Sequence, residues 1–225
     1  MNSFIVKEKA TELGADICGI AGAERFGDAP RGFQPADVLP SCKSVIVFGC
    51  RFNASLMDAV STSPYTVARN AMAENLNQIA SKLALKIADD GFDAVPIGSI
   101  GPNEYDPVAG KTMGTISLKH AAVLCGLGKM GRNTLLLNDR FGNLLWLAAV
   151  LTSAQLEADP IADYDPCGEC GQCIQCCPVD ALDGVSINQT ACRTYAFGER
   201  NGAGWKIHCF TCRKVCPNYL GSRGR

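Results

Sequence analysis

Residues 167–178 read CGECGQCIQCCP, and the spacing of these cysteines decides how we expect the C-terminal part of the chain to fold. Read as C-x2-C-x2-C-x3-C-P, the run places its thiols at Cys167, Cys170, Cys173 and Cys177. The close spacing lets one loop hold three corners of an iron–sulfur cube, while the proline turns the chain away from it. The run therefore predicts a [4Fe–4S] cluster.

A second run, CFTCRKVCP at residues 209–217, repeats the latter part of this pattern, with Lys206 standing where its first cysteine would be. Bacterial ferredoxins with two such runs bind two clusters, and the last cysteine of each run binds the cluster of the other run. The same crossing predicts two sets of ligands here. Cluster one takes Cys167, Cys170, Cys173 and Cys216, and cluster two takes Cys177, Cys209 and Cys212.

The fourth ligand of cluster two has to come from outside both runs. Cys192 is the best candidate, because it lies in the segment between the runs, which has to pass close to both clusters. Cys176 is the alternative, but adjacent residues point in different directions, so we interpret Cys176 as a packing residue beside Cys177. A three-iron second cluster and zinc binding remain open, although zinc sites rarely combine two C-P endings with a three-residue gap.

The rest of the composition predicts a globular protein of the cytoplasm. The chain has 225 residues, 13 cysteines and a formal net charge of −1, which argues against a protein devoted to nucleic-acid binding. No signal peptide is evident, and the longest apolar run, residues 144–151, is too short to span a bilayer. We therefore expect no membrane partner, and reduced thiols that bind metal. Buried structural thiols are expected at Cys18, Cys42, Cys50 and Cys125.

The crowding of cysteines after residue 166 places a domain boundary near Asp159-Pro160. We expect an α/β domain over residues 1–157 and a small metal-stapled domain over residues 158–225. In the first domain, apolar periodicity and capping residues predict alternating helices and strands. The expected helices cover residues 3–13, 63–91 (apolar face Met72, Leu76, Ile79, Leu83, Ile87) and 117–124; the expected strands cover 17–21, 44–49 and 92–97, followed by a hairpin of 135–137 with 143–151.

Gly126, Gly128 and Gly131 form a G-x-G-x-x-G match of the kind that binds dinucleotides. That fingerprint requires a strand before it and a helix after it. Here the preceding HAAVLC is helical in character, and the following stretch reads as a hairpin. We therefore interpret these glycines as serving a tight turn or a close approach of two backbone segments.

The residues around these glycines resemble a known family. Residues 117–152, SLKHAAVLCGLGKMGRNTLLLNDRFGNLLWLAAVLT, are similar to the central block of the epoxyqueuosine reductases: a helix, then A-G-L-G-x-x-G-K-N-T, then a hairpin. The likeness extends to GADICGIAG at residues 14–22 and LPSCKSVIVFG at residues 39–49. It also matches the lone Cys192 to the family's extra cluster ligand.

The resemblance implies an α+β fold with two parts. The first is a nitroreductase-like α/β domain that holds a corrinoid, and the second is a ferredoxin-like domain whose two [4Fe–4S] clusters supply electrons. The family's substrate is an epoxide-bearing queuosine precursor in the anticodon loop of tRNA, and reductive dehalogenases share the general plan. For this chain the resemblance implies a cobalamin or a flavin, bound near Gly126, Gly128, Gly131 and Asn133.

The chain departs from the family pattern at the position of the catalytic acid and in its length. The family carries a catalytic Asp in a D-T-G-P-like stretch before the glycine turn, whereas this chain has Thr112-Met113-Gly114-Thr115 there. The chain also stops nine residues after Cys216, so we expect a short member without the family's C-terminal helical-repeat extension.

Two functions follow from these observations. The first is an iron–sulfur reductase that delivers electrons to a cofactor or substrate at the N-terminal domain, with Lys119 and His120 as candidate proton donors. The second is a ferredoxin-like electron-transfer protein with no catalytic site of its own. Either needs an electron donor such as flavodoxin or ferredoxin. Residues 192–225 carry seven bases and one acid, which suits an acidic donor and leaves nucleic acid open as a partner. The sequence predicts no particular oligomeric state.

Overall fold

The computed structural model describes residues 1–106 and 111–224, which form two compact units. Unit 1 consists of Met1–Cys50, Met72–Leu127 and Trp146–Ala162, and unit 2 consists of Arg51–Ala71, Gly128–Leu145 and Asp163–Arg225. The last change of unit lies five residues after the boundary predicted from composition, and two earlier segments of the chain also join the cysteine-rich part. The roles predicted for the two domains stay predictions.

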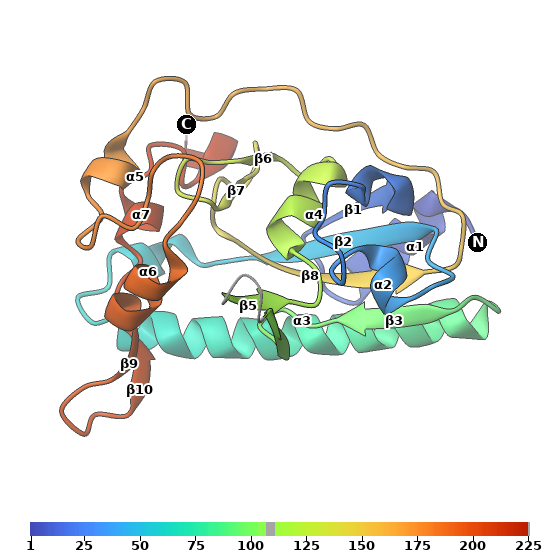
Figure 1. Cartoon of the computed structure of the whole chain (residues 1–225), viewed down its shortest axis with the longest axis horizontal. Coiled ribbons are helices and arrows are strands. Elements are labelled where there is room, and N and C mark those ends of the chain that lie inside the picture. Colours follow the sequence, from blue (N-terminus) through green and yellow to red (C-terminus); the bar gives the residue numbers. More distant parts are fainter. Residues whose placement is uncertain (107–110, 225) are drawn as a thin grey trace. The chain divides into compact units, whose positions relative to one another are not determined.

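Unit 1 is built on a four-stranded sheet in the order β1-β2-β8-β3 (Figure 1). Its strands are β1 (Ile17–Gly22), β2 (Ser44–Arg51), β8 (Leu145–Thr152) and β3 (Ala94–Ile97). β1 runs antiparallel to β2, with Ile20 opposite Ile46, and β3 runs antiparallel to β8. All residues of β2 except Arg51 are buried, as expected of a short continuous apolar run in the centre of a sheet. The three strands predicted from the first hundred residues are confirmed.

The helices of unit 1 cover this sheet through the apolar positions that the sequence indicates. Helix α1 (Ser3–Glu12) begins at Asn2, whose side chain accepts a hydrogen bond from the amide of Ile5. The predicted apolar face of α3 (Ser63–Asp89) is confirmed, because Leu76, Leu83 and the rest of its C-terminal half pack into the main core cluster. Helix α4 (Leu118–Leu124) leads into the glycine turn, as predicted.

The predicted hairpin of residues 135–137 with 143–151 is wrong. β7 (Leu136–Leu137) pairs instead with β6 (Lys129–Met130), and β8 enters the four-stranded sheet between β2 and β3. The turn between β7 and β8 has one isolated bridge, Asn138 to Gly142, and the Asn138 side chain accepts hydrogen bonds from the amides of Arg140 and Phe141 within the turn. The uniformly apolar β8 is more stable in the middle of a sheet than in a two-stranded ribbon with one solvated face.

The segment that follows β8 is fastened to unit 1 by Asp159. Its carboxylate accepts a hydrogen bond from the amide of Ile20 at 2.8 Å and forms an ion pair with Lys7. Its carbonyl accepts a hydrogen bond from Arg25 at 2.7 Å, and the same guanidinium nitrogen donates to the carbonyl of Leu124. These bonds hold the departing chain against β1 and the end of α4.

The remaining elements are short. Unit 1 also holds η1 (Ala23–Phe26), α2 (Pro35–Val38), β4 (Asn103–Asp106) and β5 (Lys111–Gly114). Unit 2 holds η2 (Ala54–Met57), α5 (Gln172–Gln175), α6 (Gln189–Ala196), β9 (Phe197–Glu199), β10 (Trp205–Ile207), α7 (Thr211–Lys214) and η3 (Gly221–Gly224). Among the described residues, no helix has both the length and the apolar character needed to cross a membrane.

Candidate metal centre

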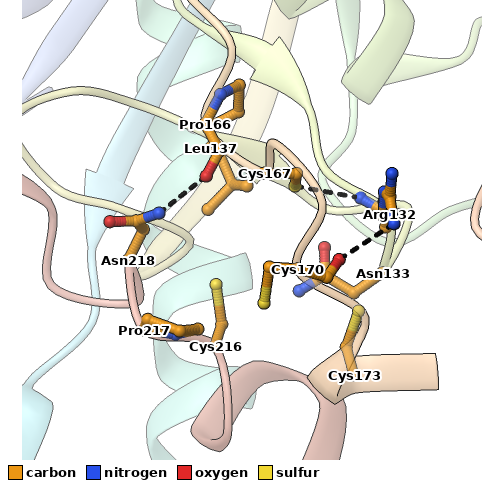
Figure 2. Close-up of a pocket in the computed structure, with 10 residues that line it drawn as sticks. All are labelled: Arg132, Asn133, Leu137, Pro166, Cys167, Cys170, Cys173, Cys216, Pro217 and Asn218. Atoms are coloured by element: carbon orange, nitrogen blue, oxygen red, sulfur yellow. Dashed lines mark hydrogen bonds between the residues drawn. The ribbon is translucent and has the colours of Figure 1, made fainter. Parts of the chain in front are cut away.

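Four cysteines from the two runs line one small hollow in unit 2 (Figure 2). They are Cys167, Cys170, Cys173 and Cys216, the four that the sequence assigns to cluster one. The other walls come from Arg132, Asn133, Leu137, Pro166, Pro217 and Asn218. Cys216 belongs to the second run and lines the hollow together with the three thiols of the first run. The assignment of these thiols to a cluster stays a prediction.

The loop that carries the first three thiols is shaped by its own backbone. The carboxylate of Asp165 accepts hydrogen bonds from the amides of Cys167 at 2.9 Å and Gly168 at 3.1 Å, and these bonds lower the pKa of Asp165. Gly168 has a φ of +47°, in the left-handed region, which lets the chain turn immediately after Cys167. Cys173 then lies on the single turn of α5 and is buried.

The side chains around the hollow fit an iron–sulfur cluster in their chemistry. Cysteine thiolates are the ligands that hold [4Fe–4S] clusters, and four of them line this one hollow. Zinc is also bound by cysteine thiolates, so it stays open as the alternative.

Two residues after the glycine turn connect it to the cysteine loops. Arg132 donates its amide to the Cys167 sulfur at 3.5 Å and its guanidinium to the carbonyl of Cys170 at 3.1 Å (Figure 2). The buried side chain of Asn133 donates to the carbonyl of Cys212 at 3.0 Å and accepts from the amide of Leu135. Arg132 and Asn133 thus brace the first and the second run, a role that the sequence did not reveal.

The glycines have the role expected of them, a close approach of backbone segments. A Cβ atom on Gly128 would lie 2.2 Å from the carbonyl oxygen of Leu137, and one on Gly131 would lie 2.6 Å from the Leu137 side chain. A Cβ atom on Gly126 would lie 2.2 Å from the carbonyl oxygen of Pro160. The turn follows helix α4 and leads into β6, the reverse of the order in a dinucleotide site. Cofactor binding by these glycines and Asn133 stays a prediction.

Three of the four thiols predicted for cluster two lie within electrostatic range of one another, as does Cys173 of the first run. Burial raises the pKa of Cys212 to about 11; the positive charge of Arg213 opposes this rise, and Cys209 and Cys192 lie near enough to add to it. Cys192 lies on α6, which begins at Asn188 with a side-chain cap. The sulfur of Cys177 accepts a hydrogen bond from the amide of Ala181 at 3.2 Å. Its membership of cluster two stays a prediction.

The remaining cysteines differ in part from expectation. Cys176, the residue that caps the C-terminal end of α5, is exposed, so the prediction that it is a packing residue is wrong. Cys50 and Cys125 are buried as predicted, and burial raises the pKa of Cys50 to about 11. Cys18 and Cys42 are only half-buried, since Cys18 lies on the edge strand β1 and Cys42 precedes β2.

The two candidate proton donors lie on α4, and His120 is exposed. Its Nδ1 atom lies 2.6 Å from the hydroxyl oxygen of Ser117. Partial burial of the ring and the charge of Lys119 lower the pKa of His120, so the neutral imidazole predominates at neutral pH. His120 also lines a cavity of about 400 Å³ in unit 1, together with Arg25, Phe26, Asp28, Ala29, Pro30, Phe33, Ile116, Ser117, Ala121, Val123 and Leu124.

Comparisons with known proteins identify the class of fold. No family model matches the chain. An epoxyqueuosine reductase from Streptococcus thermophilus superimposes with a TM-score of 0.69 at 18% identity, over 97% of this chain and 66% of that one. A catabolic reductive dehalogenase superimposes with a TM-score of 0.74 at 20% identity, over 97% of this chain and 32% of that one. The chain thus has the mixed α/β fold that these two groups of enzymes share.

Sequence similarity extends to both groups: a tetrachloroethene reductive dehalogenase of Desulfitobacterium hafniense is 27% identical over 90% of this chain, but over only 36% of its own length. The epoxyqueuosine reductase of Leadbetterella byssophila is 27% identical over 94% of this chain and 78% of its own length. The chain is therefore a homologue of curated epoxyqueuosine reductases, and the resemblance read from its sequence is confirmed. It spans about two thirds of the solved epoxyqueuosine reductases and about a third of the solved dehalogenases. One of those reductases was crystallised with an epoxyqueuosine-modified tRNA stem loop, and one dehalogenase structure suggests a B12-dependent mechanism.

Proposed function

We propose that the protein is an epoxyqueuosine reductase-like iron–sulfur reductase, in which two [4Fe–4S] clusters carry electrons toward a cofactor or substrate at the N-terminal domain. One observation carries this proposal. Four thiols from two separated runs line a single hollow in a homologue of reductases. Cluster one is assigned to Cys167, Cys170, Cys173 and Cys216, and cluster two to Cys177, Cys192, Cys209 and Cys212.

Residues around the cysteine-lined hollow would support electron transfer by a bound cluster. The clusters supply one-electron transfer when bound. The amide of Arg132, which points at the Cys167 sulfur, is placed to hydrogen-bond a ligating thiolate and favour a more negatively charged cluster. Leu137, Pro166 and Pro217 bring apolar atoms to the wall and limit access of water. The thiols must lose their protons on binding, so assembly releases protons and is favoured by higher pH.

The cluster assignment is tested by metal analysis of anaerobically reconstituted protein. Two clusters require roughly eight iron and eight sulfide ions per chain. Cys192→Ala should convert or destabilise one cluster and leave the electron paramagnetic resonance signal of the other. Cys176→Ala, the matched control at an exposed thiol, should keep both signals. Two intact four-iron signals in Cys192→Ala would show that another group is the fourth ligand.

The acceptor at the N-terminal domain is proposed to be a bound cobalamin or flavin. The cavity beside His120 has a size typical of small-molecule sites, with aromatic walls from Phe26 and Phe33 and a basic group from Arg25. Its volume of about 400 Å³ suits the ring system of a flavin, and a cobalamin bound there would extend beyond the cavity. Titration of the reconstituted protein with cobalamin, flavin mononucleotide and flavin adenine dinucleotide tests the idea. Binding of none of the three would exclude the reductase as stated.

A second candidate function, electron transfer without catalysis, is favoured by the missing acid. The stretch aligned with the family's catalytic Asp is Thr112-Met113-Gly114-Thr115, which lies on β5 and the residue after it. With a lowered pKa, His120 is a poor substitute as a proton donor at neutral pH. Turnover of an epoxyqueuosine-containing tRNA stem loop with a chemical reductant and cobalamin distinguishes the two functions. Product formation supports the reductase, and cluster reoxidation by a second protein without product supports the carrier.

A further inference from the structure

The strands β9 and β10 of unit 2 form an antiparallel hairpin (Figure 1). Basic side chains and exposed aromatic rings lie on and beside this hairpin. Trp205 is 49% exposed and Tyr195 is 39% exposed. The guanidinium of Arg69 lies 5.7 Å from the Trp205 ring centre, and that of Arg200 lies 5.6 Å from the Tyr195 ring centre. We call this set the hairpin surface: Arg69, Arg193, Tyr195, Phe197, Arg200, Trp205 and Lys206.

The charge of the hairpin surface is mainly positive. It contains four bases, and the only acid between residues 189 and 207 is Glu199, which lies opposite Trp205 on the hairpin. Arg193 and Arg200 are exposed, and Lys206 is half-buried. A surface of this kind attracts acidic partners over distances of about 10 Å in dilute salt and accelerates their association.

The hairpin surface is joined at both ends to thiols assigned to cluster two. Cys192 lies on α6 immediately before β9, and Cys209 comes two residues after β10. The amide of His208 donates to the carbonyl of Ala196 at 2.7 Å, and the amide of Ile207 donates to the hydroxyl of Thr66 at 3.0 Å. These bonds fix the base of the hairpin beside the thiols. Cys192 and Cys209 are both half-buried, so this cluster position lies close to the solvent.

We propose that the hairpin surface docks an acidic electron-carrier protein, which passes its electrons to the cluster held by Cys192, Cys209 and Cys212. This inference rests on the proposed function, because it requires that cluster. One electron leaves the reduced carrier, which is oxidised, and enters the cluster, which is reduced; no bond breaks and no proton moves. Electron-transfer complexes are typically small and steered by charge, which matches a compact basic patch beside a redox centre.

An acidic protein fits the hairpin surface better than RNA does. Single-stranded nucleic acids stack their bases on free aromatic faces. The Trp205 ring already stacks on Phe197, with centres 6.0 Å apart and planes at 14°, and it also meets Arg69. Tyr195 is engaged in the same way by Arg200, which additionally donates to the Tyr195 carbonyl. Base stacking would have to displace these contacts, whereas a carboxylate-rich surface needs only the exposed cationic groups.

The test measures how fast reduced flavodoxin, an acidic carrier, bleaches the clusters of the reconstituted protein in stopped flow at low ionic strength. The double variant Arg193→Glu/Arg200→Glu should lower the second-order rate roughly tenfold or more and flatten its dependence on salt. Lys82→Glu/Lys86→Glu, with the same change of charge at exposed positions of α3 in unit 1, should leave the rate within about twofold of the unaltered protein. Trp205→Ala, which keeps all charges, provides a second variant, and the loss of its exposed contact should also slow reduction.

Reduction by dithionite, which needs no docking, is the internal control. Equal dithionite-reducible iron in all variants together with a slow flavodoxin reaction in the hairpin variants alone supports the inference. Equal flavodoxin rates in both double variants would overturn it. So would unchanged flavodoxin rates combined with weaker binding of a tRNA stem loop, since the surface would then serve RNA. An unaltered protein without dithionite-reducible iron would instead refute the proposed function.

Discussion

The two units of this chain are stabilised by different physical means. Unit 1 has a four-stranded sheet and an apolar core in which Leu76, Leu83 and Ile87 are fully buried. Unit 2 has only short elements around its cysteine loops, and buried polar side chains such as Asn133 and Arg213 hold loop carbonyls. Burial of apolar surface can stabilise the first unit by itself. Unit 2 buries fewer large apolar side chains, Phe52, Tyr65 and Phe141 among them, and under the proposed function it gains further stability from the clusters held by its thiols.

Removal of iron is expected to have the largest effect, because it should destabilise unit 2 and leave unit 1 folded. Anaerobic chelation should unfold the cysteine loops of unit 2, because apparent free energies of structural metal binding are on the order of 10 kcal/mol and become part of the folding free energy. Hydrogen exchange should then be fast for the amides of residues 167–216 and remain slow in β1, β2 and β8 of unit 1. Slow exchange throughout unit 2 after chelation would show that its polar contacts suffice.

Truncation of a core side chain should destabilise unit 1 instead of unit 2. Leu83→Ala in unit 1 removes a side chain with no exposed surface and should lower the free energy of unfolding by about 2–5 kcal/mol. Urea unfolding followed by circular dichroism measures this loss. Leu85→Ala on the same helix, where the side chain is 65% exposed, is the matched control and should change the free energy by less than about 0.5 kcal/mol. Equal effects of the two variants would contradict the proposed core.

Asn133→Ala should have a smaller effect, confined to the cysteine-rich unit. The change leaves the carbonyl of Cys212 and the amide of Leu135 without their partner, which costs about 1–3 kcal/mol. We expect faster loss of iron to a chelator, with hydrogen exchange in β2 and β8 unchanged. Asn70→Ala, at an exposed position of the same unit, is the control and should retain iron normally. Unchanged iron retention in Asn133→Ala would show that Asn133 does not brace the second cysteine run.

Much of the fold could be predicted because its signals are local. The apolar face of α3 repeats along one helix, and the buried strand β2 is one continuous apolar run. The close approach at Gly128 could be anticipated because glycine alone lacks the Cβ atom that would collide there. The spacing within each cysteine run is likewise a local constraint imposed by the shape of a cluster.

The errors concern contacts between distant parts of the chain. The pairing of β7 with β6 depends on where β8 is placed, and a sheet position is decided by tertiary packing. Asn133 reaches the carbonyl of Cys212 across 79 residues of sequence, and such a bond leaves no periodic trace. The one available signal was the polar Asn133 beside an apolar stretch, and the family resemblance related this residue to a cofactor and not to the cysteine loops.

Arg213 should give the smallest measurable effect, on a potential and not on folding. It is 5% exposed and donates to the carbonyl of Asn143. Burial raises the pKa of the adjacent Cys212, and the positive charge of Arg213 opposes that rise. A fixed positive charge stabilises the reduced, more negative state of a cluster, so its removal should lower the reduction potential. For Arg213→Gln we expect a fall of roughly 40 mV in the potential of cluster two, equivalent to about 1 kcal/mol for one electron.

Potentiometric titration followed by electron paramagnetic resonance measures this shift. Arg213→Lys keeps the charge but loses the planar guanidinium, so it should restore most of the potential even if the contact with Asn143 is weakened. A purely structural role of Arg213 predicts the reverse: both variants would lose iron, and the potential of the remaining cluster two would not move. The pair of variants therefore separates the electrostatic effect of Arg213 on the cluster from its structural effect on unit 2. The apolar core of unit 1 allows no such test, because its side chains carry no charge.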